Sequence, residues 1–151
     1  MRGRLRSDHV EARRSSVRTA SRWLLSALYL IAGIAHLTRP SGFIAITPQW
    51  VPYPADVIAF TGIAEVAGAI GLHIPQLRKA AGVGLALYAL CVWPANLNHA
   101  INDIPLNGVH LGWWYHGPRL VLQPVIIWWA LWAGAAIEWP FGGKAATRPY
   151  R

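Results

Sequence analysis

Four stretches of the chain are almost wholly apolar, and polar or basic segments separate them. They cover residues 22–38, 55–74, 79–98 and 119–138. A helix needs roughly 20 residues to cross a hydrocarbon core about 30 Å thick. The first stretch is slightly short, so we expect its helix to begin before Arg22. The pattern predicts four transmembrane helices, and therefore an all-α membrane protein built as a four-helix bundle.

The composition supports a membrane protein. The chain has 151 residues, of which 54% are hydrophobic and 13% charged. That charged share is about half of what a typical soluble domain carries. The nine tryptophans add to the argument, because tryptophan favours the membrane–water interface.

The placement of basic residues predicts the orientation. Twelve of the fourteen Lys and Arg residues lie in the N-terminal tail, the connection between the second and third spans, and the C-terminal tail; only Arg39 and Arg119 lie on the other side. Basic flanks stay on the cytoplasmic side. We therefore predict cytoplasmic N and C termini in the plasma (inner) membrane. The basic start is long and no clear A-x-A site follows, so cleavage as a signal peptide is disfavoured.

This arrangement divides the chain into a basic cytoplasmic tail at 1–21, a transmembrane domain at 22–138 and a second basic tail at 139–151. The net charge of +8 would also suit nucleic acid. Its concentration in the flanks favours topology control instead, so the lipid bilayer is the expected partner and nucleic acid is not.

The two connections on the outer side are rich in proline and aromatic residues. They read "RPSGFIAITPQWVPYPAD" and "INDIPLNGVHLGWWYHGPR". Backbone without hydrogen-bond partners cannot face lipid, so we expect these outer loops to lie in the interface or to cap the bundle. Ordinary external loops are the alternative.

Small residues recur four apart in the second and third spans. Such stripes let helix backbones approach closely in a membrane. The pairs are Ala64/Gly68, Ala67/Gly71, Ala80/Gly84 and Gly82/Ala86. They favour helix packing over the plain abundance of Gly and Ala.

Five polar residues are candidates for binding a ligand. By helix direction, four belong to the outer half of the bundle: His36, Asn96, Arg119 and Gln123. Glu65 lies about 15 Å into the second span, near the midplane. A carboxylate there is costly unless it is paired, hydrated or protonated. A structural role for Glu65, bonding a neighbouring helix, weighs about equally with a functional one, and single polar groups at helix ends also serve as headgroup anchors.

Two prolines lie at the same depth as these polar groups. Pro94 and Pro124 remove helix hydrogen bonds, and we expect them to kink their helices and free the carbonyls of Leu90 and Leu120. Kinked helices, an outer cap and polar residues at one depth together predict a cavity open towards the outer leaflet.

An ordered series of motifs resembles the DoxX-like family of small membrane proteins. It consists of "YLIAGIAHLTRPSGF", "TPQWVP", "TGIAEVAGAIGL", "PANLNHA" and "RLVLQPVIIWWALW". The resemblance covers about residues 22 to 134 and implies a four-helix membrane bundle. Some relatives are associated with thiosulfate:quinone oxidoreduction or thiol redox stress. The matched positions are His36, Pro48, Glu65, Pro94, Asn96, Arg119 and Gln123.

Two functions fit these features. The first is a quinone- or redox-associated membrane subunit, because a quinone needs an apolar slot, hydrogen-bond donors and a proton-exchanging acid. It implies a soluble redox partner. The alternative is a binding, transport or partner-docking module for a small amphiphile, without catalysis.

Other chemistry is poorly supported by the sequence. Haem held by His36 and His99 is disfavoured, because both histidines lie at span ends. No catalytic motif is found, so whether the chain is an enzyme stays open. No metal site is predicted. The lone Cys91 cannot form a disulfide or a CxxC redox centre within one chain.

Overall fold

A computed structural model describes residues 2–106 and 108–140, with the side chains of residue 13 and of residues from 15 onward in those ranges. The described chain is helical and contains no strand. Its elements are α1 (Arg2–Thr38), α2 (Ser41–Ile46), α3 (Pro54–Gly71), α4 (Arg78–Ile101) and α5 (Gly112–Ala133).

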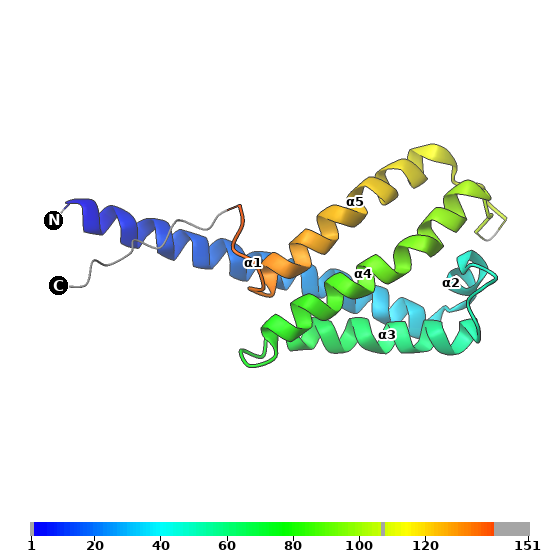
Figure 1. The fold of residues 1–151 in the computed structure, drawn as a ribbon, viewed down its shortest axis with the longest axis horizontal. Coiled ribbons are helices and arrows are strands. Elements are labelled where there is room, and N and C mark those ends of the chain that lie inside the picture. Colours follow the sequence, from blue (N-terminus) through cyan, green and yellow to red (C-terminus); the bar gives the residue numbers. More distant parts are fainter. Residues whose placement is uncertain (1, 107, 141–151) are drawn as a thin grey trace.

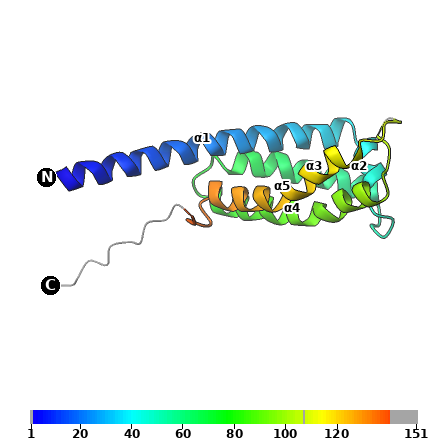
Figure 2. The same cartoon turned by 90° about the horizontal axis from the view of Figure 1, so that it is seen from above.

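The four long helices lie along one axis in two antiparallel pairs. α1 packs most extensively on α3, and α4 on α5. In Figure 1 the second pair crosses the first diagonally, whereas Figure 2 shows all four running along the same axis. The short α2 contacts α3 and α4. We call the end of the bundle that carries α2 the α2 end, and the opposite end, where α5 finishes beside α1, the Arg22 end.

Three described helices are long and apolar enough to cross a membrane: Ser15–Thr38 within α1, α3 and α4. α5 is long enough but falls short in apolarity. His116 and Arg119 lie in its first half and Gln123 lies at its middle, and these polar side chains lower its mean hydropathy. An all-helical protein with membrane-compatible helices is thus confirmed, but the fourth span remains a prediction.

Several helix boundaries differ from those expected. α1 continues from Arg2 through the predicted tail, and α3 ends at Gly71 rather than residue 74. α4 runs to Ile101 rather than residue 98. The tail at 139–151 lies almost wholly outside the described residues.

The last helix was predicted at 119–138, and this range was wrong. α5 begins at Gly112, so Trp113, Trp114 and Tyr115 belong to its first turn rather than to a connection. It ends near Gly134, where Ala135 adopts φ +57° and the Ala136 amide donates to the Leu131 carbonyl at 2.8 Å. That left-handed ending closes a helix, although the apolar sequence continues to residue 137.

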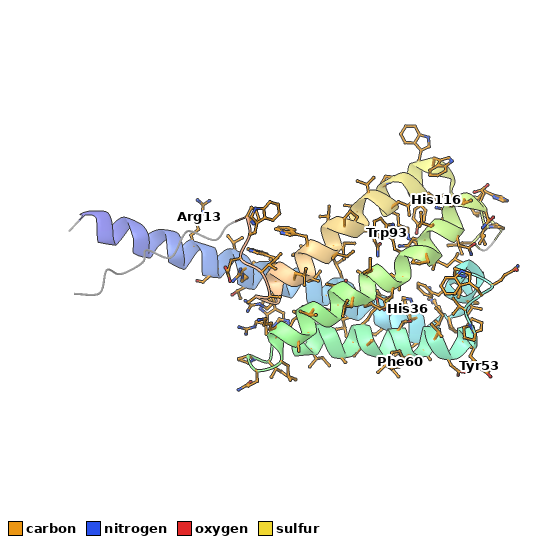
Figure 3. The ribbon with its side chains drawn as sticks, viewed as in Figure 1. Arg13, His36, Tyr53, Phe60, Trp93 and His116 are labelled. Atoms are coloured by element: carbon orange, nitrogen blue, oxygen red, sulfur yellow. The ribbon has the colours of Figure 1, made fainter. Side chains whose placement is uncertain are left out.

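Large apolar side chains cover the outside of the bundle as well as filling its core. The central packing is built from Leu25, Leu72, Leu85 and small alanines. Large apolar side chains face outward, among them Phe60, which is 71% exposed and points away from the bundle in Figure 3. Several polar side chains are buried instead. Exposed apolar side chains together with buried polar ones suit lipid as the surrounding solvent.

Glycines set how closely the helices approach. A Cβ added at Gly82 of α4 would lie 2.7 Å from the Ala130 carbonyl oxygen and 2.7 Å from the Gly134 Cα of the neighbouring segment. At Gly68 an added Cβ would meet the Leu85 side chain. Gly84, two residues from Gly82, has open space around it. The predicted small-residue stripes therefore serve packing at Gly68 and Gly82, but not at Gly84.

We predict that Gly82→Ala destabilises the bundle and Gly84→Ala does not. The Gly82 methyl would collide with backbone, at a cost of about 1–3 kcal/mol. The Gly84 methyl would face open space and would gain helix propensity of up to about 1 kcal/mol. Unfolding in detergent micelles measures both variants. Equal stability of the two would contradict the close α4–α5 contact.

Candidate functional site

All five sequence-predicted polar residues line one cavity. It has a volume of about 390 Å³, lies at the α2 end, and takes its walls from all five helices. Most of the lining is apolar, and Phe43 of α2 and Trp50 of the segment before α3 contribute to it. The principal polar side chains of the lining are His36, Glu65, Tyr88, Asn96, Arg119 and Gln123. Pro94 also lines it, whereas Pro124 is exposed and lies outside the lining.

His36 and Glu65 form a buried pair across α1 and α3. The His36 Nδ1 lies 2.8 Å from the Glu65 Oε2. The side chains are 9% and 3% exposed. The same Nδ1 lies 2.9 Å from the Ala32 carbonyl oxygen, one turn earlier in α1. Nδ1 therefore faces two acceptors and must carry a hydrogen.

Nδ1 meets its two neighbouring oxygens with different geometry. Its hydrogen points at the Ala32 carbonyl with hydrogen-bond geometry, whereas Oε2 of Glu65 has no bond of good geometry despite the short distance. The contact with Glu65 is thus close but poorly aligned, whereas the aligned hydrogen bond goes to the Ala32 carbonyl. The Phe43 ring stacks on the imidazole with centroids 3.8 Å apart, which holds the ring in place.

The pair depends on a close approach of α1 and α3. A Cβ added at Gly33 would lie 2.8 Å from the Gly62 carbonyl oxygen, and one added at Gly62 would lie 2.9 Å from the His36 Cβ. These glycines lie three residues before His36 and Glu65 respectively. The two backbones therefore nearly touch one turn away from the pair, which lets the two short side chains meet.

A second polar arrangement joins α4 to α5. The Asn96 Nδ2 donates to the Gln123 Oε1 at 3.0 Å, and the Gln123 Nε2 donates to the Ala89 carbonyl. The Ala89 carbonyl precedes Pro94 by five residues, next to the carbonyl of Leu90 that the proline was expected to free. Gln123 therefore bonds backbone in the turn that Pro94 disturbs, and both amides are fixed in orientation.

Arg119 lies beyond Gln123, further towards the α2 end of the bundle. Its Nη1 lies 2.9 Å from the His99 Nδ1, and its guanidinium lies 5.6 Å from the centre of the Tyr115 ring. Arginine can only donate, so His99 accepts at Nδ1 and carries its hydrogen on Nε2. The direct polar partner of Arg119 is thus His99, which was not among the five candidate residues.

Two buried residues were missed by the sequence reasoning. Tyr88 lines the cavity and interacts with Glu65; its signal was a hydroxyl within the apolar run that precedes Pro94. His116 is 2% exposed and packs edge-on against His99, with ring centroids 4.5 Å apart. It was assigned to a loop because the start of α5 was misplaced. Figure 3 shows His116 and Trp93 on the facing sides of α5 and α4.

The haem hypothesis gains nothing from the geometry. His36 lines the cavity, whereas His99 does not, and His99 Nδ1 is engaged by Arg119. Two axial ligands on one cofactor would have to face one space. Among the described residues, no group of three or more His, Cys, Asp or Glu side chains is arranged to hold a metal ion.

The comparison with known proteins gives one match. Residues 25–134 match the family described as a domain of unknown function (DUF8561). The chain belongs to this family. The DUF8561 region begins within α1 and ends at the close of α5, so it contains the whole cavity. No curated protein and no solved structure matches the chain.

We predict that His36 and Glu65 are energetically coupled. Glu65→Gln keeps the shape of the side chain and should fold almost normally. Glu65→Leu leaves the imidazole without its carboxylate and should cost about 1–3 kcal/mol of unfolding free energy. In the double variant His36→Leu/Glu65→Leu the loss should fall short of the sum of the single losses by roughly 0.5–3 kcal/mol. Detergent-micelle unfolding measures the cycle, and additive losses would show that the pair is not coupled.

Proposed function

We propose that this DUF8561 protein is a four-span membrane protein whose cavity binds a quinone, and that it acts as a membrane subunit of a redox system. The observation that carries the proposal is the cavity itself. Its apolar walls meet a buried acid–base pair, two oriented amides and a guanidinium at one end of the bundle. The DoxX-like resemblance of the sequence motifs points to the same class of function.

The size and chemistry of the cavity suit a quinone head group. Its volume of about 390 Å³ falls within the range typical of small-molecule sites, roughly 300–1,000 Å³. The apolar lining would accept the ring, and Arg119 would donate to a carbonyl oxygen. Quinone reduction takes up two electrons and two protons. A soluble oxidoreductase partner would supply the electrons, and the His36–Glu65 pair would pass the protons.

The topology is part of the proposal. The α1 start and the α5 end lie at the same end of the bundle in Figure 1, as an even number of spans requires. The excess of basic residues supports a cytoplasmic Arg22 end, and the cavity would then lie in the outer half of the membrane. α2 and the segment to residue 53 would then form an outer cap, held in part by the Asn98 Nδ2 bond to the Ile46 carbonyl at 2.9 Å.

The polar face of α5 supports its assignment as the fourth span. Its polar residues His116 and Gln123 are buried, and Arg119 lines the cavity. Val121, 70% exposed, and Leu122, 51% exposed, face outward. A helix whose polar groups point into the bundle can lie in lipid despite a modest mean hydropathy.

We predict that a soluble alkyl-benzoquinone quenches the tryptophan fluorescence of the purified protein saturably, because Trp50 and Trp129 line the cavity. Ala95→Phe adds a ring to the cavity lining and should weaken binding by about tenfold or more, which corresponds to about 1.4 kcal/mol. Leu97→Phe is the matched control on α4, since Leu97 is outside the lining. Equal affinities of the two variants would place the quinone elsewhere.

The alternative function is a binding, transport or docking module for a small amphiphile without catalysis. The same cavity supports it. Glu65→Gln separates the two functions, with Asp56→Asn at the exposed start of α3 as control. A redox role requires that the Glu65 variant bind quinone yet lose quinone-dependent turnover in native membranes. If the Glu65→Gln variant keeps both quinone binding and turnover, the result favours the binding module without catalysis.

We predict that the connection at 39–54 lies outside the cytoplasm and the C terminus inside it. A periplasm-active reporter fused after residue 45 should be active, and a cytoplasm-active reporter fused after residue 151 should be active. The reason is the excess of basic residues at the Arg22 end. A cytoplasmic 39–54 segment would contradict both the topology and the outward position of the cavity.

A further inference from the structure

A second hollow lies at the Arg22 end of the bundle. It has a volume of about 800 Å³ and is formed by α1, the start of α4 and the segment that follows α5. Four arginines line it, and Glu138 is the one acid in the lining. They are Arg13, Arg18, Arg22 and Arg78. Counting one charge for each, the hollow carries a net charge of +3.

Arg18 is neutralised within the hollow. Its Nη1 and Nη2 donate to the two Glu138 carboxylate oxygens at 3.0 and 2.9 Å, and its guanidinium lies 5.1 Å from the centre of a Trp132 ring. This bidentate pair fixes the segment after α5 against α1. The excess positive charge therefore rests on the other three arginines.

Arg22 and Arg78 are held in place with most of their donors unused. The Arg22 Nε donates to the Ala133 carbonyl at 3.0 Å, and the Arg78 Nε donates to the Leu72 carbonyl at 3.1 Å. Within the described part of the chain, their terminal Nη groups make no further hydrogen bond. A guanidinium has five N–H donors, so each of the two retains four for a ligand.

The two guanidiniums also repel each other. Arg78 and Arg18 both act electrostatically on Arg22. Nothing in the described lining besides Glu138 offsets this repulsion, and Glu138 is paired with Arg18. An anion between Arg22 and Arg78 would replace the repulsion with two charge-assisted interactions, and phosphate matches the fork geometry of arginine.

The position of the hollow identifies the source of the phosphate. Arg22 is followed directly by Trp23 and Leu24, which are 64% and 56% exposed and begin the apolar outer surface. The hollow therefore lies where charged surface gives way to lipid-facing surface. A lipid phosphate lies at this boundary, with its acyl chains running along the apolar face. Tryptophan next to the site is typical of the interface.

We propose that Arg22 and Arg78 bind the phosphate of an anionic phospholipid head group at the Arg22 end of the bundle. Basic pockets between transmembrane helices on the cytoplasmic side are known to hold such head groups. This site is independent of the cavity, since the two hollows share no lining residue.

The test is native mass spectrometry of the full chain in mixed micelles that contain phosphatidylglycerol and phosphatidylcholine. The wild-type protein should retain phosphatidylglycerol over phosphatidylcholine by about tenfold. The double variant Arg22→Gln/Arg78→Gln should lose this preference. Arg39→Gln, which changes an exposed arginine at the α2 end, is the control and should keep it.

Two further arms make the result decisive. Inorganic phosphate should compete poorly with phosphatidylglycerol; equal competition would show a site for free phosphate and overturn the lipid assignment. Arg78→Lys keeps the charge but lacks the planar guanidinium, so it should reduce the preference for phosphatidylglycerol in part. This single variant also keeps the proposal testable if the double variant does not fold. An unchanged preference in Arg78→Lys and in Arg78→Gln would overturn the proposal.

Discussion

The cavity depends on the contact between the backbones of α1 and α3 at Gly33 and Gly62. The two helices approach so closely that a methyl group on either glycine would meet backbone of the other helix within 3.0 Å. In lipid no hydrophobic effect drives helices together, so such close packing and interhelical polar contacts supply the association. His36 and Glu65 lie one turn further along their helices and meet at 2.8 Å. Packing and polar pairing thus reinforce each other at one place.

The pairing explains how the membrane protein holds a buried carboxylate. An isolated charge at that depth is costly, whereas a charge beside an imidazole and a tyrosine is partly compensated. Tyr88 from α4 interacts with the same carboxylate, so three helices converge on Glu65. Its helical neighbours Gly62 and Ala69 leave room for them. A polar centre of this kind also fixes the register of the helices, because a shift by one residue would separate the partners.

The sequence predicts which polar residues line the cavity. It does not predict how they pair or where α5 begins and ends, for physical reasons. Depth along each span was enough to select His36, Glu65, Asn96, Arg119 and Gln123, since helix rise is regular. Their pairing depends on helix rotation and crossing, which one sequence does not specify. The start of α5 was misplaced because a tryptophan-rich amphipathic turn resembles an interfacial loop. His116 was lost with it. α5 ends early because Ala135 adopts a left-handed conformation. An alanine in the sequence does not predict such a conformation.

The charges of the cavity constrain what it can bind. Arg119 is always charged, and its neighbour His99 accepts its hydrogen bond and is therefore neutral. With Glu65 ionised and His36 neutral, the cavity carries no net charge. When the pair takes up one proton, the carboxylate and imidazole are together neutral and Arg119 leaves a net charge of +1. A quinone bound as proposed would enter uncharged and would gain electron density on its oxygens as it is reduced. Proton uptake by His36 and Glu65 would thus make the cavity more favourable for the ligand as the ligand becomes more negative, and this coupling would be absent for an amphiphile that is only bound.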